Sequence, residues 1–174
     1  MKVEIRLTGA LHREMLEDLA RHHPFAAERV GFACGRIGSL ADRGTLILLN
    51  RYHPIPDDQY LEDRTVGARI GREAITWAMQ AVYHGRPAHE GIFHVHLHDH
   101  RGATGMSPVD RDEIPKLIPG FQSVGPEAVH GMIILSRDHG AGWVWLPGHL
   151  EAVTAGRISV IGKPVGIFEQ ETGP

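Results

Sequence analysis

Apolar and polar residues recur along this chain with two periods, which predict strands interspersed with about three helices. Residues 2–8 alternate one by one, as the residues of a half-buried strand do. Leu11, Met15 and Leu19 recur at helical spacing, and Pro24 marks the end of that helix. Further strands are predicted at 29–37, 45–50, 130–136, 142–146, 157–161 and from Gly91 into the histidines that follow, and further helices at 66–83 and from Ser107–Pro108 onward.

Turn residues connect these elements into a single unit. A turn at 42–44 joins the strands 29–37 and 45–50 into a hairpin. The segment 118–126 is so rich in Gly and Pro that we expect a loop there. Strands interleaved with helices predict an α/β or α+β domain of two or three layers. No repeat or linker divides the chain, so residues 1–174 are expected to form one domain.

The composition indicates which classes of partner and which cellular compartment to expect. The net charge of the 174 residues is −3 with neutral histidines, and basic residues are not clustered. Nucleic acid and membranes are therefore not expected as partners. No apolar run approaches the ~18 residues of a membrane helix. The chain has no signal-peptide core at its start, and its one cysteine, Cys34, has no internal disulfide partner. A cytoplasmic protein is the expectation.

A histidine-rich segment carries the first candidate chemistry. Four of the thirteen histidines stand at every second position from His94 to His100. In a strand, residues i and i+2 point to one face, about 6–7 Å apart at the backbone. A catalytic zinc takes three protein ligands and keeps an open position. His94 and His100 would lie about 20 Å apart, so only an adjacent pair can serve one ion. We expect His94 and His96, which follow the apolar run 91–93 directly.

The segment Ser107-Pro-Val-Asp110 has the residues of a helix start. Serine at the N-cap, proline in the first turn and a carboxylate at the third position together favour helix capping. The same geometry would also fix a hydroxyl and a carboxylate rigidly at the exit of a loop. Asp110 is therefore a candidate for the third metal ligand.

Glu28 stands at the head of a predicted buried strand. A carboxylate in this position is more often a solvated edge residue. Its functional interpretation is a general base, because a second carboxylate can accept the proton of a metal-activated water.

Together these residues resemble the signature of the JAB1/MPN/Mov34 metalloproteases, often called JAMM proteases. Glu28 heads a Glu-x-x-Gly-x-x-x-Gly strand, and His94-x-His96 and Ser107-x-x-Asp110 follow in the same order. The resemblance covers nearly the whole chain. It implies a fold similar to that of cytidine deaminases, a mixed sheet flanked by helices. It also implies a zinc peptidase that cleaves at the C-terminus of ubiquitin-like proteins.

Site roles follow from this resemblance position by position. His94, His96 and Asp110 would hold one zinc ion per chain. Glu28 would take a proton from the attacking water and later protonate the leaving amine. Ser107 would donate a hydrogen bond to the tetrahedral oxyanion.

Two departures from the family pattern leave a second register open. Val95 and Leu97 stand where the family has Ser or Thr and then Pro, and ten residues separate His96 from Ser107 where seven are usual. A register that uses His96 and His98 leaves eight. We prefer His94 and His96, because the approach through Gly91-Ile-Phe resembles that of the family.

The resemblance also predicts partners and two alternatives. Small bacterial proteins of this type act on a ubiquitin-like protein or its conjugate, beside E1- and E2-like enzymes, including those of antiphage defence systems. One alternative is a non-catalytic interaction scaffold of the MPN type. The other is a peptidase that matures a sulfur-carrier or phage-tail protein.

Overall fold

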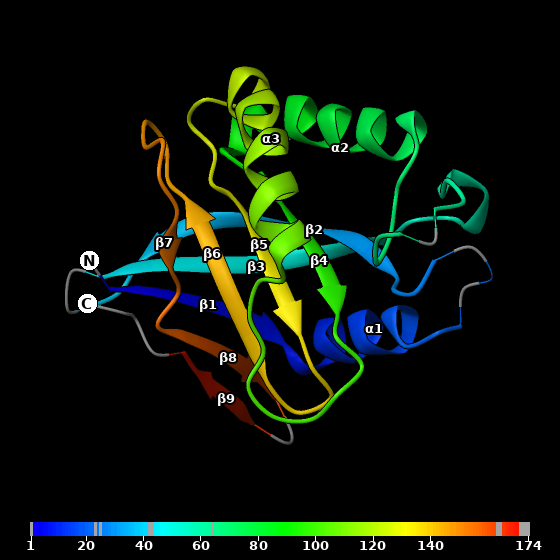
Figure 1. Cartoon of the computed structure of the whole chain (residues 1–174). Coiled ribbons are helices and arrows are strands. Elements are labelled where there is room, and N and C mark those ends of the chain that lie inside the picture. The colour runs from blue at the N-terminus through cyan, green and yellow to red at the C-terminus, as the bar shows by residue number, and fades with distance from the viewer. Residues whose placement is uncertain are drawn as a thin grey trace.

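The computed structural model describes residues 2–22, 24, 26–41, 44–63, 65–162 and 165–170. Within this part of the chain lie nine strands, three α-helices and two short 3-10 helices (Figure 1). In chain order they are β1 (Val3–Thr8), α1 (Gly9–Leu19), β2 (Val30–Ser39), β3 (Thr45–Pro54), η1 (Asp57–Gln59), α2 (Arg72–Gly85), η2 (Arg86–Ala88), β4 (Gly91–Leu97), α3 (Pro108–Val124), β5 (His130–Leu135), β6 (Gly140–Trp145), β7 (Val153–Thr154), β8 (Arg157–Ile161) and β9 (Gly166–Glu169).

All nine of these strands belong to one mixed sheet. Their order is β7-β6-β5-β4-β2-β3-β1-β8-β9. Parallel pairing joins β4 to β5 and joins β1 to both β3 and β8, and the other neighbours are antiparallel. The sheet curls until β6 approaches β8, where Gly142 lies against Ile5 and Ile158. The histidine strand β4 lies in the interior of the sheet, paired on both sides.

Two hydrophobic clusters pack on the two faces of the sheet. The inner face of the curl buries Ile5 and Phe93 together with Leu11, Met15 and Leu19 of α1. The other face, at β2, β4, β5 and β6, packs against α2 and α3. Figure 1 shows α2 and α3 together on one side of the sheet and α1 on the other. In α1, the apolar residues at i, i+4 and i+8 lie on one face of the helix, and this face packs against the sheet.

The general class predicted from the pattern is confirmed: this is a mixed α/β structure with a mixed sheet flanked by helices. The predicted hairpin of β2 and β3 is confirmed by their antiparallel register. The short edge strands β7 and β9 were not predicted. No helix in the described residues is long and apolar enough to cross a membrane.

The helix predicted over 66–83 begins later than expected, at Arg72. The preceding residues fold back instead: Tyr60 and Ile70 form a β-bridge, and the amide of Gly71 donates to the carbonyl of Gln59 (2.7 Å). Tertiary pairing with the preceding loop here overrides the helical spacing of the apolar residues.

The loop predicted at 118–126 is wrong, because α3 continues through it to Val124. Pro115 and Pro119 both lie on the exposed side of this helix, where water can satisfy the carbonyls that lose their partners. Ile114, Ile118 and Phe121 occupy the opposite side and are buried. Burial of this apolar stripe outweighs the two missing helical hydrogen bonds.

Candidate metal centre

Two imidazoles and two carboxylates converge near the end of β4. The Nε2 atoms of His96 and His98 lie 3.2 Å apart. The carboxylate of Asp110 lies 3.5 Å from Nε2 of His96 and 3.9 Å from Nε2 of His98. Oε1 of Glu28 lies 4.0 Å from Nε2 of His98. One ligand atom each from Glu28, His96 and His98 lies within 4.8 Å of the others, so this group could hold a metal ion.

The strand places the two histidines on one face. His96 pairs with Val30 of β2 and Ile134 of β5, and its side chain is only 2% exposed. His98 follows the last residue of β4, but its amide still donates to the carbonyl of Leu135 (2.9 Å). The strand geometry therefore continues for one more residue. As a result, His98 points to the same side of the sheet as His96.

Ser107 and Asp110 form the predicted helix cap at the start of α3. The Ser107 hydroxyl accepts from the amide of Asp110 (3.1 Å), and the Ser107 amide donates to Oδ2 of Asp110 (2.8 Å). Oδ1 of Asp110 faces His96. The cap and the contact with His96 therefore coexist, because the cap uses Oδ2 of Asp110 and His96 faces Oδ1.

Glu28 lies in the segment between α1 and β2. Its amide donates to the carbonyl of Gly67 (2.9 Å), and a Cβ at Gly67 would lie 2.6 Å from Glu28 Oε2. The neighbouring Arg29 is 2% exposed and donates to the carbonyls of Arg21 (2.9 Å) and His22 (3.0 Å) and to Asp57 (2.7 Å). The backbone that carries Glu28 is therefore held by its own bond to Gly67 and by the bonds of the Arg29 side chain.

His94 does not belong to the converging group. It lies on the same face as His96, with ring centroids 5.5 Å apart, and its ring packs edge-on against Phe32. Burial, followed by repulsion from His96, lowers the pKa of His94 to about 3, so this imidazole is neutral. His100 lies beyond the centre, with Nδ1 3.0 Å from the carbonyl of Arg101. Among the adjacent pairs weighed from the sequence, the structure brings His96 and His98 together with Asp110 and Glu28.

The charges at the centre favour a cation. Burial opposes ionisation of Asp110, but the hydrogen bond from His96 and the bonds from Ser107 hold its pKa below the usual range for aspartate. Burial and the nearby His96 lower the pKa of His98, which keeps that ring neutral at pH 7. Within the described part of the chain, neither Asp110 nor Glu28 forms an ion pair with Lys or Arg. Two carboxylates and two imidazoles match the needs of a divalent cation.

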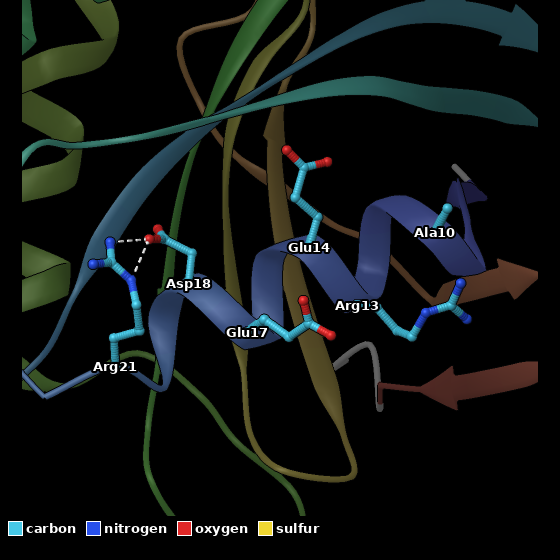
Figure 2. Close-up of a pocket in the computed structure, with 6 residues that line it drawn as sticks. All are labelled: Ala10, Arg13, Glu14, Glu17, Asp18 and Arg21. Carbon is cyan, nitrogen blue, oxygen red and sulfur yellow. Dashed lines mark hydrogen bonds and ion pairs between the residues drawn. The ribbon is translucent and has the colours of Figure 1, made fainter.

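A separate hollow of about 400 Å³ lies along α1, away from this centre. Figure 2 shows its lining side chains, which come from successive turns of one helix face, and the pair formed by Asp18 and Arg21. They are Ala10, Arg13, Glu14, Glu17, Asp18 and Arg21. None of them is a metal-ligating residue of the predicted site, so we do not assign this hollow to the candidate chemistry.

Comparisons with known proteins add little to this description. No family model matches the chain, and no curated protein matches it. Among solved structures it is similar to the Trichoplax adhaerens STIL N-terminal domain, at 12% identity and a TM-score of 0.39. The match covers 80% of this chain and 40% of that chain. A similarity of this size carries no argument about function.

Two residues at the centre were not predicted from the sequence. Thr104 lies in the loop after β4, with Oγ1 3.1 Å from Nδ1 of His98. Gly67 lies against Glu28, as described above. No local motif marks either residue, because each contact joins segments whose separation only the fold defines.

Proposed function

We propose that this protein is a zinc-dependent peptidase of the JAMM type, with His96, His98 and Asp110 as ligands. The observation that carries the proposal is the convergence of two imidazoles with Asp110 and Glu28. The predicted residues Glu28, His96, Ser107 and Asp110 all take part, and His98 replaces His94.

The general class of the fold and the order of the site residues support this proposal. The mixed sheet is flanked by helices, and the histidines lie on an interior strand. The order of the site residues along the chain is also that of the family signature. The similarity thus concerns the motif, and both the specific fold and the family assignment are part of the proposal.

Zinc fits the spacing of the donor atoms. With Zn–N bonds of 2.0–2.1 Å, two nitrogens of a tetrahedral site lie about 3.3 Å apart. The two Nε2 atoms are 3.2 Å apart, so they need almost no movement to share one ion. Oδ1 of Asp110, at 3.5 Å from Nε2 of His96, completes a set of three protein ligands. Two nitrogens and one carboxylate oxygen are the donor set of many hydrolytic zinc sites.

The two carboxylates suit different roles. Asp110 is 14% exposed, lies closer to an imidazole and is fixed by the helix cap. Glu28 is 32% exposed and lies 4.0 Å from its nearest histidine nitrogen. The fixed, more buried group is the better ligand, and the more accessible one is the better proton carrier.

A zinc ion held by His96, His98 and Asp110 would supply a water of lowered pKa and a Lewis acid for the substrate carbonyl. Glu28 accepts the proton of the attacking water and transfers it to the leaving amine nitrogen. Ser107 uses its hydroxyl oxygen as the acceptor in the helix cap, so its O–H remains available to donate to the developing oxyanion. No covalent intermediate with the protein is required.

The substrate class follows from the family resemblance. An extended, glycine-rich tail of a ubiquitin-like protein can bind by pairing its backbone with the protein. The backbone at Gly67 lies beside Glu28, because the amide of Glu28 donates to the carbonyl of Gly67, and a tail bound at Glu28 would pass next to it. E1- and E2-like enzymes of a conjugation system would be the functional partners.

The first test is the metal content of histidine variants after dialysis. We expect about one zinc per chain in the wild type, in His94→Ala and in the exposed control His149→Ala. His96→Ala and His98→Ala should lose most of it, because each removes one of three ligands. Zinc retained in His98→Ala and lost in His94→Ala would restore the register with His94.

The second test separates a peptidase from a scaffold. Glu28→Gln should retain zinc but lose cleavage of ubiquitin-like proteins that carry a C-terminal fluorogenic amide. Glu14→Gln, the same change at an exposed glutamate of α1, should leave both unchanged. Zinc binding without hydrolysis of any ubiquitin-like substrate in the wild type would favour the non-catalytic scaffold.

A further inference from the structure

The imidazole of His98 has a hydrogen-bond partner on the side away from the candidate centre. Its Nδ1 lies 3.1 Å from Oγ1 of Thr104, while its Nε2 faces His96 and Asp110. The two nitrogens of one ring therefore meet different partners. Thr104 is half-buried and lies three residues before the helix cap at Ser107.

The loop that carries Thr104 is attached to the turn between β5 and β6. Ser136 donates its hydroxyl to the carbonyl of Gly102 (2.8 Å), and the amide of Gly102 donates to Asp138 (2.7 Å). The amide of Arg137 also donates to the carbonyl of His100 (2.9 Å). Gly102 has a φ of 91°, a conformation that favours glycine. These bonds fix the backbone of the loop residues that precede Thr104.

The protonation pattern of His98 decides whether it can bind a metal. A neutral imidazole has one N–H and one lone pair. If Nδ1 donates its proton to Thr104, the lone pair of Nε2 faces the centre. If the hydroxyl of Thr104 donates instead, Nε2 carries the proton and cannot be a ligand.

We propose that Thr104 is a positioning residue. Its hydroxyl oxygen accepts a hydrogen bond from Nδ1–H of His98, which leaves the lone pair of Nε2 free to bind a metal ion. This inference rests on the proposed zinc site but adds a residue that belongs to neither the ligand set nor the motif. Hydrogen-bond partners of this kind orient metal-ligating histidines, and their loss weakens metal affinity about 10–100-fold.

The other two histidines on this face have no such partner. Among the residues that the structure describes, neither Nδ1 of His96 nor Nδ1 of His94 has a hydrogen-bond partner, and both atoms are buried. His96 is held by the sheet on both sides, whereas His98 lies beyond the end of β4. Thr104 therefore restrains the ring that the strand itself restrains least.

Zinc affinity, measured by competition with a chromophoric chelator, tests this role. Thr104→Val keeps the shape of the side chain and removes the acceptor, so its zinc dissociation constant should rise about 10–100-fold. Thr104→Ser keeps the hydroxyl and should bind zinc within about threefold of the wild type. Thr76→Val makes the same change at an exposed position of α2 and should have no effect. Cobalt spectra of each variant should show altered coordination only in Thr104→Val.

The outcomes are distinct. Equal zinc affinity in the wild type and in a folded Thr104→Val would overturn the inference while leaving the proposed peptidase intact. Weak binding by Thr104→Ser, which retains the acceptor, would also overturn it. If the wild type binds no zinc, the inference fails together with the proposed function.

Discussion

Replacement of Gly67 by alanine should slow catalysis without weakening the fold. The added Cβ would lie 2.6 Å from Oε2 and 2.9 Å from Cδ of Glu28, whereas ordinary contacts begin near 3.4 Å. The carboxylate must therefore retreat by about 0.8 Å. It can do so because it lies at the end of a flexible side chain. The backbone of Gly67 is outside the left-handed region, so alanine is not strained there.

The size of the expected effect follows from this displacement. A misplacement of about 1 Å in a reacting group can cost about 10²-fold in rate, so we expect kcat to fall about 10–100-fold. KM should change little, since Glu28 acts on the proton and does not hold the substrate. Stability should be equal or up to about 1 kcal/mol higher, because alanine restricts the unfolded chain.

The assay combines steady-state hydrolysis of a ubiquitin-like substrate, zinc content and urea unfolding. Gly105→Ala is the matched control: it lies near Ser107, and its added Cβ would meet open space, so turnover and zinc content should equal those of the wild type, and any change in stability should match that of Gly67→Ala. Normal turnover in a folded, zinc-loaded Gly67→Ala protein would refute the assigned role of Glu28 or its position.

Two further predictions concern the helix cap and pH. Ser107→Ala should reduce turnover about 10²–10³-fold, as loss of one oxyanion donor does, and should destabilise the fold by about 1 kcal/mol through loss of the cap, with zinc retained. In Glu90, burial alone would raise the pKa, but the bond from Asn50 and the charges of Arg51 and Arg36 lower it below the ordinary 4.5. Its ionised form therefore stabilises the fold above that pH, and this contribution is lost as the pH falls through the lower folded value. Urea unfolding should show Glu90→Gln less stable than the wild type at pH 7, and the gap should close in acid; a gap independent of pH would argue against the ion pairs.

Most of the residues that converge at the end of β4 could be predicted from the sequence, but the pair of histidines among them could not. Alternation along the strand places His94, His96, His98 and His100 on one face without choosing between adjacent pairs. The choice depends on where the first turn of α3 meets β4, since Asp110 reaches the end of the strand. The position of α3 relative to β4 is a feature of the tertiary structure, so a local sequence pattern does not reveal it. The spacing to Ser107 favours the pair His96 and His98. The resemblance of Gly91-Ile-Phe to the family's approach to its first ligand favours the pair His94 and His96 instead.

Helix boundaries show the same limit of local patterns. The prolines of α3 indicate a loop when the segment is read alone, yet the stripe of Ile114, Ile118 and Phe121 packs against the sheet and keeps it helical. At α2 the opposite happened, because pairing of Tyr60 with Ile70 removed six residues from a plausible helix. In both segments, contacts that only the complete fold creates decided the outcome: burial of one face in α3 and backbone pairing before α2.

Arg29 gives the candidate site an unusual mutational sensitivity. Its guanidinium reaches two carbonyls and one carboxylate in separate directions, and it is almost fully buried. Lysine carries the same charge but cannot reproduce this planar fork. In a saturation scan, position 29 should therefore tolerate no substitute, lysine included, although its guanidinium bonds to Arg21, His22 and Asp57 and is not a member of the candidate metal group. Substitutions of the adjacent Glu28 should instead be depleted only when the scan selects for activity, and not when it selects for folding. Two consecutive codons would then separate the requirements of folding from those of catalysis.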